Sequence, residues 1–347
     1  MSYTNGLDKP SDYFNTKLYA GNGTDDHAIT GVGFQPDLTW LKTRASGSHY
    51  WFDNVRGATK FIKSDGTDAE GTASSTLKSF DTDGFTLGTS GAVNSGTENF
   101  ASWNWLAGGT ASSNTDGSIT STVSANTTSG FSIVSYTGTG SAGTVGHGLG
   151  SAPAFYVIKQ RDAVGGWIVY HKGNTSAPET DYLRLDKTDA TVDDAIFNDT
   201  APTSSVFSIG INAPVNTSSG TYVAYCFAEK KGFSSFGSYV GNGSSDGTFI
   251  YTGFRPAFII AKESSEARDW QLWDNKRLGY NATGGNKNLL PNSSNAEDTY
   301  ADIDILSNGF KLRSTSSAHN KVSQTYIYMA FAESPLVGTN NTPATAR

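Results

Sequence analysis

The chain has 347 residues, a formal net charge of −7 and only 16% charged residues. This length predicts two or three domains, and the acidic balance argues against nucleic acid as a partner, because proteins bind polyanions through an excess of Lys and Arg. The 39 glycines and 12% aromatic residues, in a chain rich in Ser, Thr and Asn, favour short strands and tight turns over helices. The predicted fold class is all-β.

The first unit is predicted over residues 13–107, after an N-terminal tail of residues 1–12. Its opening strand ends in Tyr19-Ala-Gly-Asn-Gly23, a turn in which glycine tolerates positive φ. Pro36 follows 17 residues after the tyrosine, where it suits the first position of a strand. The apolar run from there to Lys42 is nearly continuous, which indicates a strand covered on both faces, with the lysine ending it at the surface.

The same pattern returns twice. A linker over residues 108–129 leads to the second unit, residues 130–229, and two lysines separate that unit from the third, residues 232–334. The Gly/Ser/Thr-rich linker predicts that the first joint is looser than the second. The equivalent residues of the later units are Tyr136, Pro153 and Lys159, then Tyr239, Pro256 and Lys262. We therefore predict three tandem β-sandwich repeats, of jelly-roll or lectin-like type, with each tyrosine and each proline in the same structural place.

The buried parts of each unit can also be predicted. Phe155, Val157, Phe258 and Ile260 belong to the post-proline strands and are expected in the cores. A tryptophan, Trp51, Trp167 or Trp270, follows eight or nine residues after each lysine, and this recurring spacing favours packing over ligand binding. Cys226 is the only cysteine, so no intrachain disulfide can form. It lies in an aromatic stretch that is typical of a buried strand.

No pattern predicts catalysis or a cofactor. The five histidines are scattered over the three units, and His147 is interpreted as a loop residue that faces water. Asp302 and Asp304 alternate correctly for a pair of catalytic or calcium-binding carboxylates, but a solvated strand face is the preferred interpretation. A single cysteine excludes the common structural zinc sites. We expect no enzyme, no metal and no cofactor.

The ends of the chain lie outside the repeated units. The C-terminal segment, residues 335–347, is predicted to be a docking tail, with Leu336 and Val337 as apolar anchors and Arg347 available to pair with a carboxylate. The N-terminus lacks the basic and apolar regions of a signal peptide, and no apolar run approaches the ~20 residues of a membrane-spanning helix. We expect synthesis in a host cytoplasm and no membrane insertion.

Residues 130–140, Gly-Phe-Ser-Ile-Val-Ser-Tyr-Thr-Gly-Thr-Gly, continue through His147-Gly-Leu-Gly and Pro153 to Lys159. This succession, together with residues 333–347, resembles a repeat family of virion proteins from marine bacteriophages, those of cyanobacteria and pelagic bacteria, whose members are variously labelled tail-fibre, lectin-like or head-associated. The resemblance covers nearly the whole chain and implies a place in the virion and no catalytic residues.

Three functions follow as hypotheses. The first is a tail- or capsid-associated structural protein that binds other virion proteins and itself, as a homo-oligomer. The second is a receptor-binding protein of the tail-fibre or adhesin class that recognises a host surface glycan through aromatic and amide side chains. The third and least favoured is an enzyme that degrades surface polysaccharide.

Overall fold

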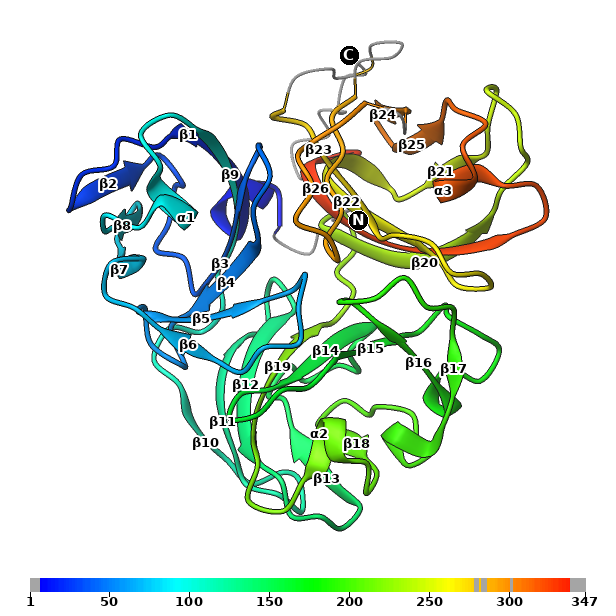
Figure 1. Ribbon diagram of the computed structural model, residues 1–347. Helices are drawn as coiled ribbons and strands as arrows, with labels where there is room; N and C mark the ends of the chain where they lie inside the picture. The colour runs from blue at the N-terminus through cyan, green and yellow to red at the C-terminus, as the bar shows by residue number, and fades with distance from the viewer. Residues whose placement is uncertain (1–6, 278–280, 282–285, 300–301, 338–347) are drawn as a thin grey trace.

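The computed structural model describes residues 7–277, 281, 286–299 and 302–337. It confirms the all-β class. Three sandwich-like units surround a common centre, and each unit pairs a large antiparallel sheet with a smaller one (Figure 1). The large sheets face the centre and the small sheets lie outside.

In the first unit the 3-10 helix η1 (Pro10–Asp12) precedes a large sheet with the order β1 (Phe14–Ala20), β9 (Asn99–Trp105), β3 (Leu38–Thr43), β4 (His49–Asp53), β5 (Lys60–Lys63) and β6 (Gly71–Thr72). The small sheet has the order β2 (His27–Thr30), β8 (Gly84–Leu87) and β7 (Leu77–Asp81), and the one-turn helix α1 (Gly91–Asn94) precedes β9.

In the second unit the large sheet has the order β10 (Ser112–Asn114), β11 (Ser121–Asn126), β12 (Phe131–Thr137), β19 (Thr221–Phe227), β14 (Phe155–Gln160), β15 (Trp167–His171), β16 (Asp181–Arg184) and β17 (Val192–Asp193). The small sheet and the short helices are β13 (Gly143–Gly146), β18 (Val206–Ile209), η2 (Pro178–Thr180), η3 (Ala195–Phe197) and α2 (Ala213–Asn216).

In the third unit the large sheet has the order β20 (Ser234–Val240), β26 (Thr325–Pro335), β22 (Phe254–Glu263) and β23 (Gln271–Asp274). The small sheet has the order β21 (Phe249–Tyr251), β25 (Gly309–Leu312) and β24 (Ile303–Leu306), and α3 (Ser317–Asn320) is the counterpart of α1 and α2.

The tyrosine of the repeated phrase occupies the same place in all three units, as predicted. Its ring stacks on the aromatic residue that it opposes across the ladder, with ring centroids 5.1 Å apart in every unit. Its hydroxyl donates to a backbone carbonyl of the one-turn helix. The three sets of tyrosine, ladder partner and carbonyl residue are Tyr19, Phe100 and Val93; Tyr136, Tyr222 and Val215; and Tyr239, Tyr326 and His319.

The two glycines of the phrase have separate structural reasons. A Cβ on the first glycine would lie 2.1–2.4 Å from a backbone carbonyl oxygen that follows the one-turn helix, and the second glycine has φ of 68–76°. A fully buried asparagine at the end of that helix then fixes the loop, because its side-chain oxygen accepts a loop N–H and its amide donates to a loop carbonyl. These asparagines are Asn94, Asn216 and Asn320.

The post-proline strands are buried, as predicted, but their two faces belong to different cores. Phe155 and Val157 of β14 face the centre of the molecule, whereas Tyr156 and Ile158 face the core of their own sandwich. Alternation along a strand requires this division. Pro36 and Pro153 precede their strands as expected, but β22 begins earlier, at Phe254, and Pro256 lies at an irregularity in its pairing.

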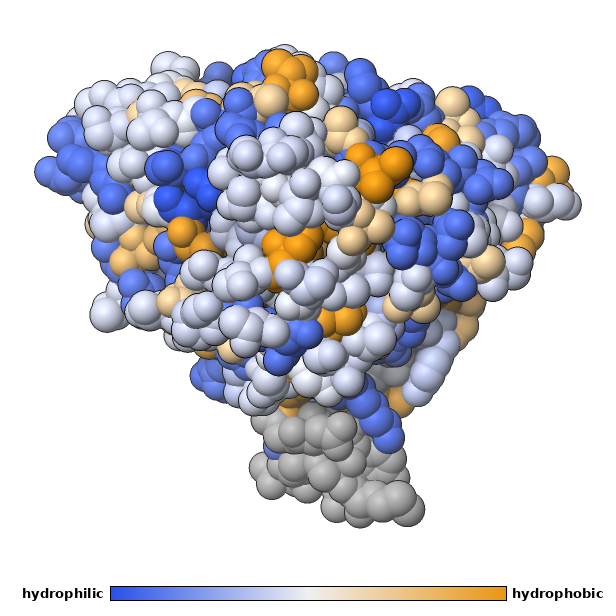
Figure 2. Space-filling model, turned by 90° about the horizontal axis from the view of Figure 1, so that it is seen from below, coloured by the Kyte–Doolittle hydropathy of each residue, from blue (hydrophilic) through white to orange (hydrophobic). Residues whose placement is uncertain are grey.

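The central core is built from the inward faces of all three large sheets. Its residues include Trp40 and Trp105 from the first unit, Phe227 from the second, and Phe258 and Phe331 from the third, all at most 2% exposed. Hydrophobic residues on the face in Figure 2 form separate patches among polar ones, as expected if the large apolar faces are buried between the units.

Backbone hydrogen bonds join each unit to the next and close the ring. At each joint a backbone N–H of one unit donates to a backbone carbonyl of the next unit, at 2.7–3.0 Å. The acceptor always lies two residues after a repeat lysine, and the pairs are Glu70 to Arg161, Thr191 to Ser264, and Glu297 to Arg44. A reciprocal bond of 2.7–2.9 Å runs in the other direction: Gly165 to Thr67, Arg268 to Thr188, and Gly47 to Ser294. The same contact, made three times in cyclic order, gives the chain approximate three-fold symmetry.

Buried polar groups repeat around the same ring. Asp53, His171 and Asp274 occupy one ladder position, opposite Leu38, Phe155 and Phe258. Each bonds to the neighbouring unit: Tyr225 donates to Asp53 at 2.6 Å, His171 donates to the Tyr328 carbonyl at 2.9 Å, and Trp103 donates to Asp274 at 3.1 Å. Arg56 and Arg277 form fully buried ion pairs with the two aspartates, so these charges are compensated.

Several predictions about the joints are wrong. The predicted linker, residues 108–129, contains β10 and β11, which pair with β12 and belong to the second sandwich. The described part of the predicted N-terminal tail, residues 7–12, is also integrated, because Leu7 is only 1% exposed and contributes to the central core, while residues 1–6 lie outside the described residues. The three tryptophans are also not all equivalent. Trp167 and Trp270 occupy the ladder position that His49 has in the first unit, whereas Trp51 lies two residues after His49 and opposes Trp40.

Candidate docking site

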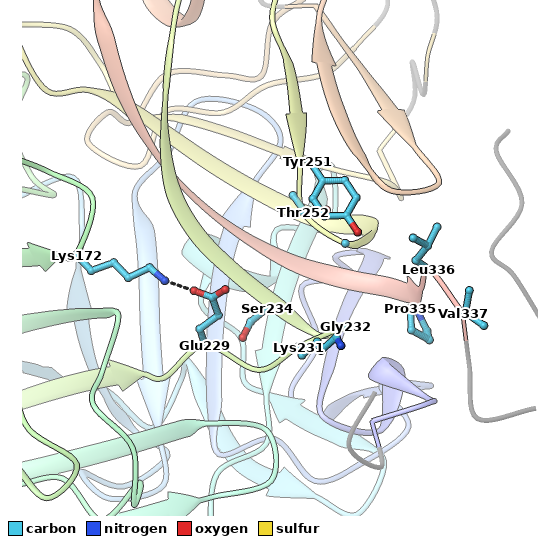
Figure 3. Close-up of a pocket in the computed structure, with 11 residues that line it drawn as sticks. Lys172, Glu229, Lys231, Gly232, Ser234, Tyr251, Thr252, Pro335, Leu336 and Val337 are labelled. Carbon is cyan, nitrogen blue, oxygen red and sulfur yellow. Dashed lines mark hydrogen bonds and ion pairs between the residues drawn. The ribbon is translucent and has the colours of Figure 1, made fainter. Parts of the chain in front are cut away.

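Leu336 and Val337, two of the three predicted partner-binding residues, line a hollow of about 770 Å³ between the second and third units. Figure 3 shows Leu336 on the side of Tyr251 and Thr252, and Val337 beyond it. Arg347, the third predicted residue, lies outside the described residues. The remaining lining residues are Lys172, Glu229, Lys231, Gly232, Ser234, Gly253 and Pro335.

The length of β26 brings the two apolar residues to this place. β9 and β19 have seven residues each, but β26 has 11 and continues to Pro335, which opposes Phe254 at the early start of β22. The Arg255–Glu333 ion pair, at 2.8 Å, joins the two extended strands. Leu336 and Val337 therefore follow a strand whose end is fixed by pairing.

The hollow combines apolar surface with a polar rim. Tyr251 is 60% exposed and is one of the few large aromatic side chains on the described surface. Lys172 and Glu229 form an ion pair on the opposite wall (Figure 3), and the Thr252 hydroxyl donates to the Phe254 carbonyl at 2.7 Å. An apolar centre with a polar rim is typical of a binding surface.

The site was only partly predictable. Tyr251 was missed, although a comparison of the units contains a signal for it. The segment Phe249-Ile-Tyr251 is aromatic at the two positions where the equivalent segments have Ala28 and Thr30 in the first unit and Thr144 and Gly146 in the second. Exposed aromatic residues in only one of three equivalent strands indicate a role that is not needed for folding.

The residues that we considered for catalysis have structural roles or solvent-facing positions. His147 does not face water as predicted: it is fully buried, accepts the Leu149 N–H and donates to the Thr203 carbonyl at 3.1 Å. Burial lowers its pKa. Asp304 pairs with Arg313 at 3.3 Å and is partly exposed. Within the described ranges, no group of three or more His, Cys, Asp and Glu side chains could hold a metal ion.

The three repeat lysines are buried and do not end at the surface as predicted. Lys42, Lys159 and Lys262 are at most 1% exposed, and each ammonium donates to carbonyls at the end of its own strand. The Lys159 ammonium also reaches the Thr67 carbonyl across the joint, at 3.3 Å. Desolvation lowers the pKa of each from 10.5 to about 8. The backbone carbonyls compensate part of the cost of burying these charges.

The lowered pKa values of these lysines predict that the free energy of unfolding depends on pH. Between pH 8 and 10.5 the unfolded chain binds a proton at each lysine that the folded chain has released, so the free energy of unfolding rises with pH in this interval. We expect wild type to gain about 1–2 kcal/mol relative to Lys262→Met between pH 8 and 9.5, from ~1.4 kcal/mol per pH unit for one proton. Urea unfolding of both proteins at several pH values measures this. A difference that does not change with pH would contradict it.

Among the residues that the structure describes, none forms a helix long and apolar enough to span a membrane.

The comparisons with known proteins give one match. Residues 9–335 match a family described as Domain of unknown function (DUF7483). No curated protein and no solved structure matches the chain. The matched range begins before η1 and ends at the last residue of β26, so it covers the complete ring of three units as one domain. The chain therefore belongs to the family of the domain of unknown function DUF7483.

Proposed function

We propose that this protein is a non-catalytic structural component of a bacteriophage particle, associated with the tail or the capsid, and that it binds neighbouring virion proteins through the hollow around Leu336 and Val337. The observation that carries the proposal is the presence of these two apolar residues in one hollow with the exposed Tyr251. The phage family that the sequence resembles supplies the setting.

The ring supports an assembly role. Three sandwiches that share one core and are joined by paired backbone bonds form a rigid body, and a rigid body loses little conformational entropy when it is incorporated into a larger structure. Self-association into a homo-oligomer in the particle is part of the same proposal.

Receptor binding is the second candidate. The exposed ring of Tyr251 offers a flat apolar face, and the ion pair of Lys172 and Glu229 lies across the same hollow from it. Proteins bind sugars through this combination of an aromatic face and polar groups. In that case the partner is a host surface glycan instead of a virion protein, and the same hollow is involved.

Particles grown with a Leu336→Ser, Val337→Ser double variant test the proposal. Each lost anchor is worth ~1.5–3 kcal/mol if fully buried by the partner, so we expect at least about a tenfold fall in the copies per particle. The matched control is Val164→Ser, Ile211→Ser, because these residues of the second unit are 73% and 71% exposed but lie outside the hollow.

Quantitative mass spectrometry of purified particles measures the occupancy of each protein. Equal occupancy of the double variant and wild type would refute the role of the hollow, and absence of wild type from particles would refute the proposed function. Normal occupancy with loss of adsorption to host cells would favour the glycan-binding alternative.

A further inference from the structure

The outer edge of β13 in the second unit is covered by the chain itself. Ile119 forms a parallel bridge with Val145, and its N–H donates to the Thr144 carbonyl at 3.0 Å. The Ser118 N–H donates to the Thr144 hydroxyl and the Thr144 N–H to the Ser118 hydroxyl, both at 2.9 Å. The segment between β10 and β11 therefore adds itself to the small sheet as an extended chain.

The same edge exists in the other two units. Val145, Ile29 and Ile250 each point into a sandwich core and oppose a buried phenylalanine, Phe207, Phe85 and Phe310 respectively. In an antiparallel pair, alternate residues direct their backbone N–H and C=O groups to the partner strand and to the open edge. In the second unit the backbone groups of Thr144 face the edge of the small sheet, away from β18. The counterparts of Thr144 are Ala28 in the first unit and Phe249 in the third.

The hydrogen bonds of the third unit agree with this register. Thr248 and Thr252 bond to Leu312 and Asn308 on the β25 side, so Phe249 and Tyr251, which alternate with them, direct their backbone groups outward. Within the described ranges β25 is the only strand that pairs with β21. No described segment covers this edge of β21 in the way that residues 118–119 cover the edge of β13.

The side chains at this open edge differ from those of the other units. Phe249 is 42% exposed and Tyr251 is 60% exposed, and both lie on the outer face of the small sheet. In the first unit the equivalent residues, Ala28 and Thr30, are also exposed but are small. Exposed aromatic residues beside unpaired backbone groups favour association with another chain.

We propose that the edge of β21 binds an extended segment of another virion protein by strand addition, in the parallel direction that the chain itself shows at β13. This inference rests on the proposed function and names the mode of attachment. Main-chain hydrogen bonds to Phe249 and Tyr251 hold the segment, and the side chains that alternate along it determine specificity.

The direction of the added strand connects it with the hollow. A chain that runs parallel to β21 passes Phe249, then Tyr251, and continues to Thr252 and Gly253, which line the hollow together with Leu336. The part of the added segment that lies beyond Tyr251 therefore enters the hollow and contacts its apolar wall at Leu336. This continuity joins the aromatic edge to the part of the hollow that the third unit forms.

The residue at position 251 also restricts the occupant. A Cβ on Gly146, the counterpart of Tyr251, would lie 1.7 Å from the Asn114 side-chain oxygen, so the side chain of Asn114 would have to move to admit a larger residue there. A copy of that polar segment, with its asparagine in the same place, would meet the ring of Tyr251. The occupant instead has an apolar side chain that packs on the tyrosine ring.

A proline at the edge tests the proposal. The N–H of Phe249 faces away from β25, so Phe249→Pro removes a donor for strand addition without removing a bond of the native sheet. Ala28→Pro is the matched control, because it makes the same change at the equivalent edge of the first unit. Both purified variants are expected to unfold at the wild-type denaturant midpoint.

In purified particles we expect the occupancy of Phe249→Pro to fall at least tenfold and that of Ala28→Pro to equal wild type. Wild-type occupancy of Phe249→Pro would overturn the inference while the proposed function stands, and absence of wild type from particles would overturn both.

If Phe249→Pro does not fold, a photo-crosslinking residue at position 251 tests whether another chain lies along β21. The expected result is a crosslink, in particles, to one segment of another virion protein. Particles that contain the crosslinker at normal occupancy and give no such adduct would overturn the inference.

Discussion

Phe258→Ala is expected to lower the free energy of unfolding of the whole chain by ~3–5 kcal/mol, the range for removing a fully buried phenylalanine ring. Phe258 is completely buried and lies on the central face of β22. Its ring centroid is 5.5 Å from that of Phe14 and 5.5 Å from that of Trp105, both in the first unit, and 6.2 Å from that of Phe331. Truncation therefore leaves a cavity between units.

Phe249→Ala is the control for this experiment. It removes the same side chain from the same unit, but the ring is 42% exposed at the outer edge, so the expected change is within about 0.5 kcal/mol. Chemical denaturation of the two variants and wild type measures both values. A loss below about 1 kcal/mol for Phe258→Ala would show that the central core contributes little to stability.

Much of the fold could be predicted from the spacing of a few residues. Tyr19, Tyr136 and Tyr239 are equivalent because each ends a strand, stacks on its ladder partner and bonds to a one-turn helix, and this combination tolerates little change in spacing. The strand after each proline was predicted from its apolar run. The limits of the units were less predictable, because the Gly/Ser/Thr-rich stretch before the second unit has the composition of a linker but pairs as β10 and β11.

The ring itself was not predicted, and the reason is physical. A continuous apolar run such as Phe155 to Ile158 indicates that both faces of a strand are covered, but it does not specify what covers each face. The central face is covered by other units far away in the sequence. The lysines were misplaced for a related reason: the carbonyls that accept from Lys42, Lys159 and Lys262 are backbone groups, which leave no pattern in the sequence.

The hollow was predicted in part. Leu336 and Val337 were identified because they are apolar residues outside the repeats, and the structure brings them into one hollow. Tyr251 and Phe249 were not identified, because an aromatic residue in a strand is usually a core residue. Their exposure in the structure shows that these two side chains face outward, and the comparison with β2 and β13 shows that the equivalent residues are not aromatic.

We expect the three units to unfold as one. Each large sheet has one apolar face toward its own sandwich and another toward the centre, so a unit that separated from the ring would expose the second face to water. It would also break two backbone hydrogen bonds at each of its joints. These costs make partly unfolded states, with one unit detached, unfavourable relative to complete unfolding.

Native-state hydrogen exchange in increasing denaturant tests this account most directly, because the amides of β3, β14 and β22 report on the three units separately within one molecule. We predict that all three strands exchange through the same opening, with free energies that agree within about 1 kcal/mol and with the same dependence on denaturant. Three different free energies, each with a smaller denaturant dependence, would show that the units open independently, and the description of the protein as one closed ring would then be wrong.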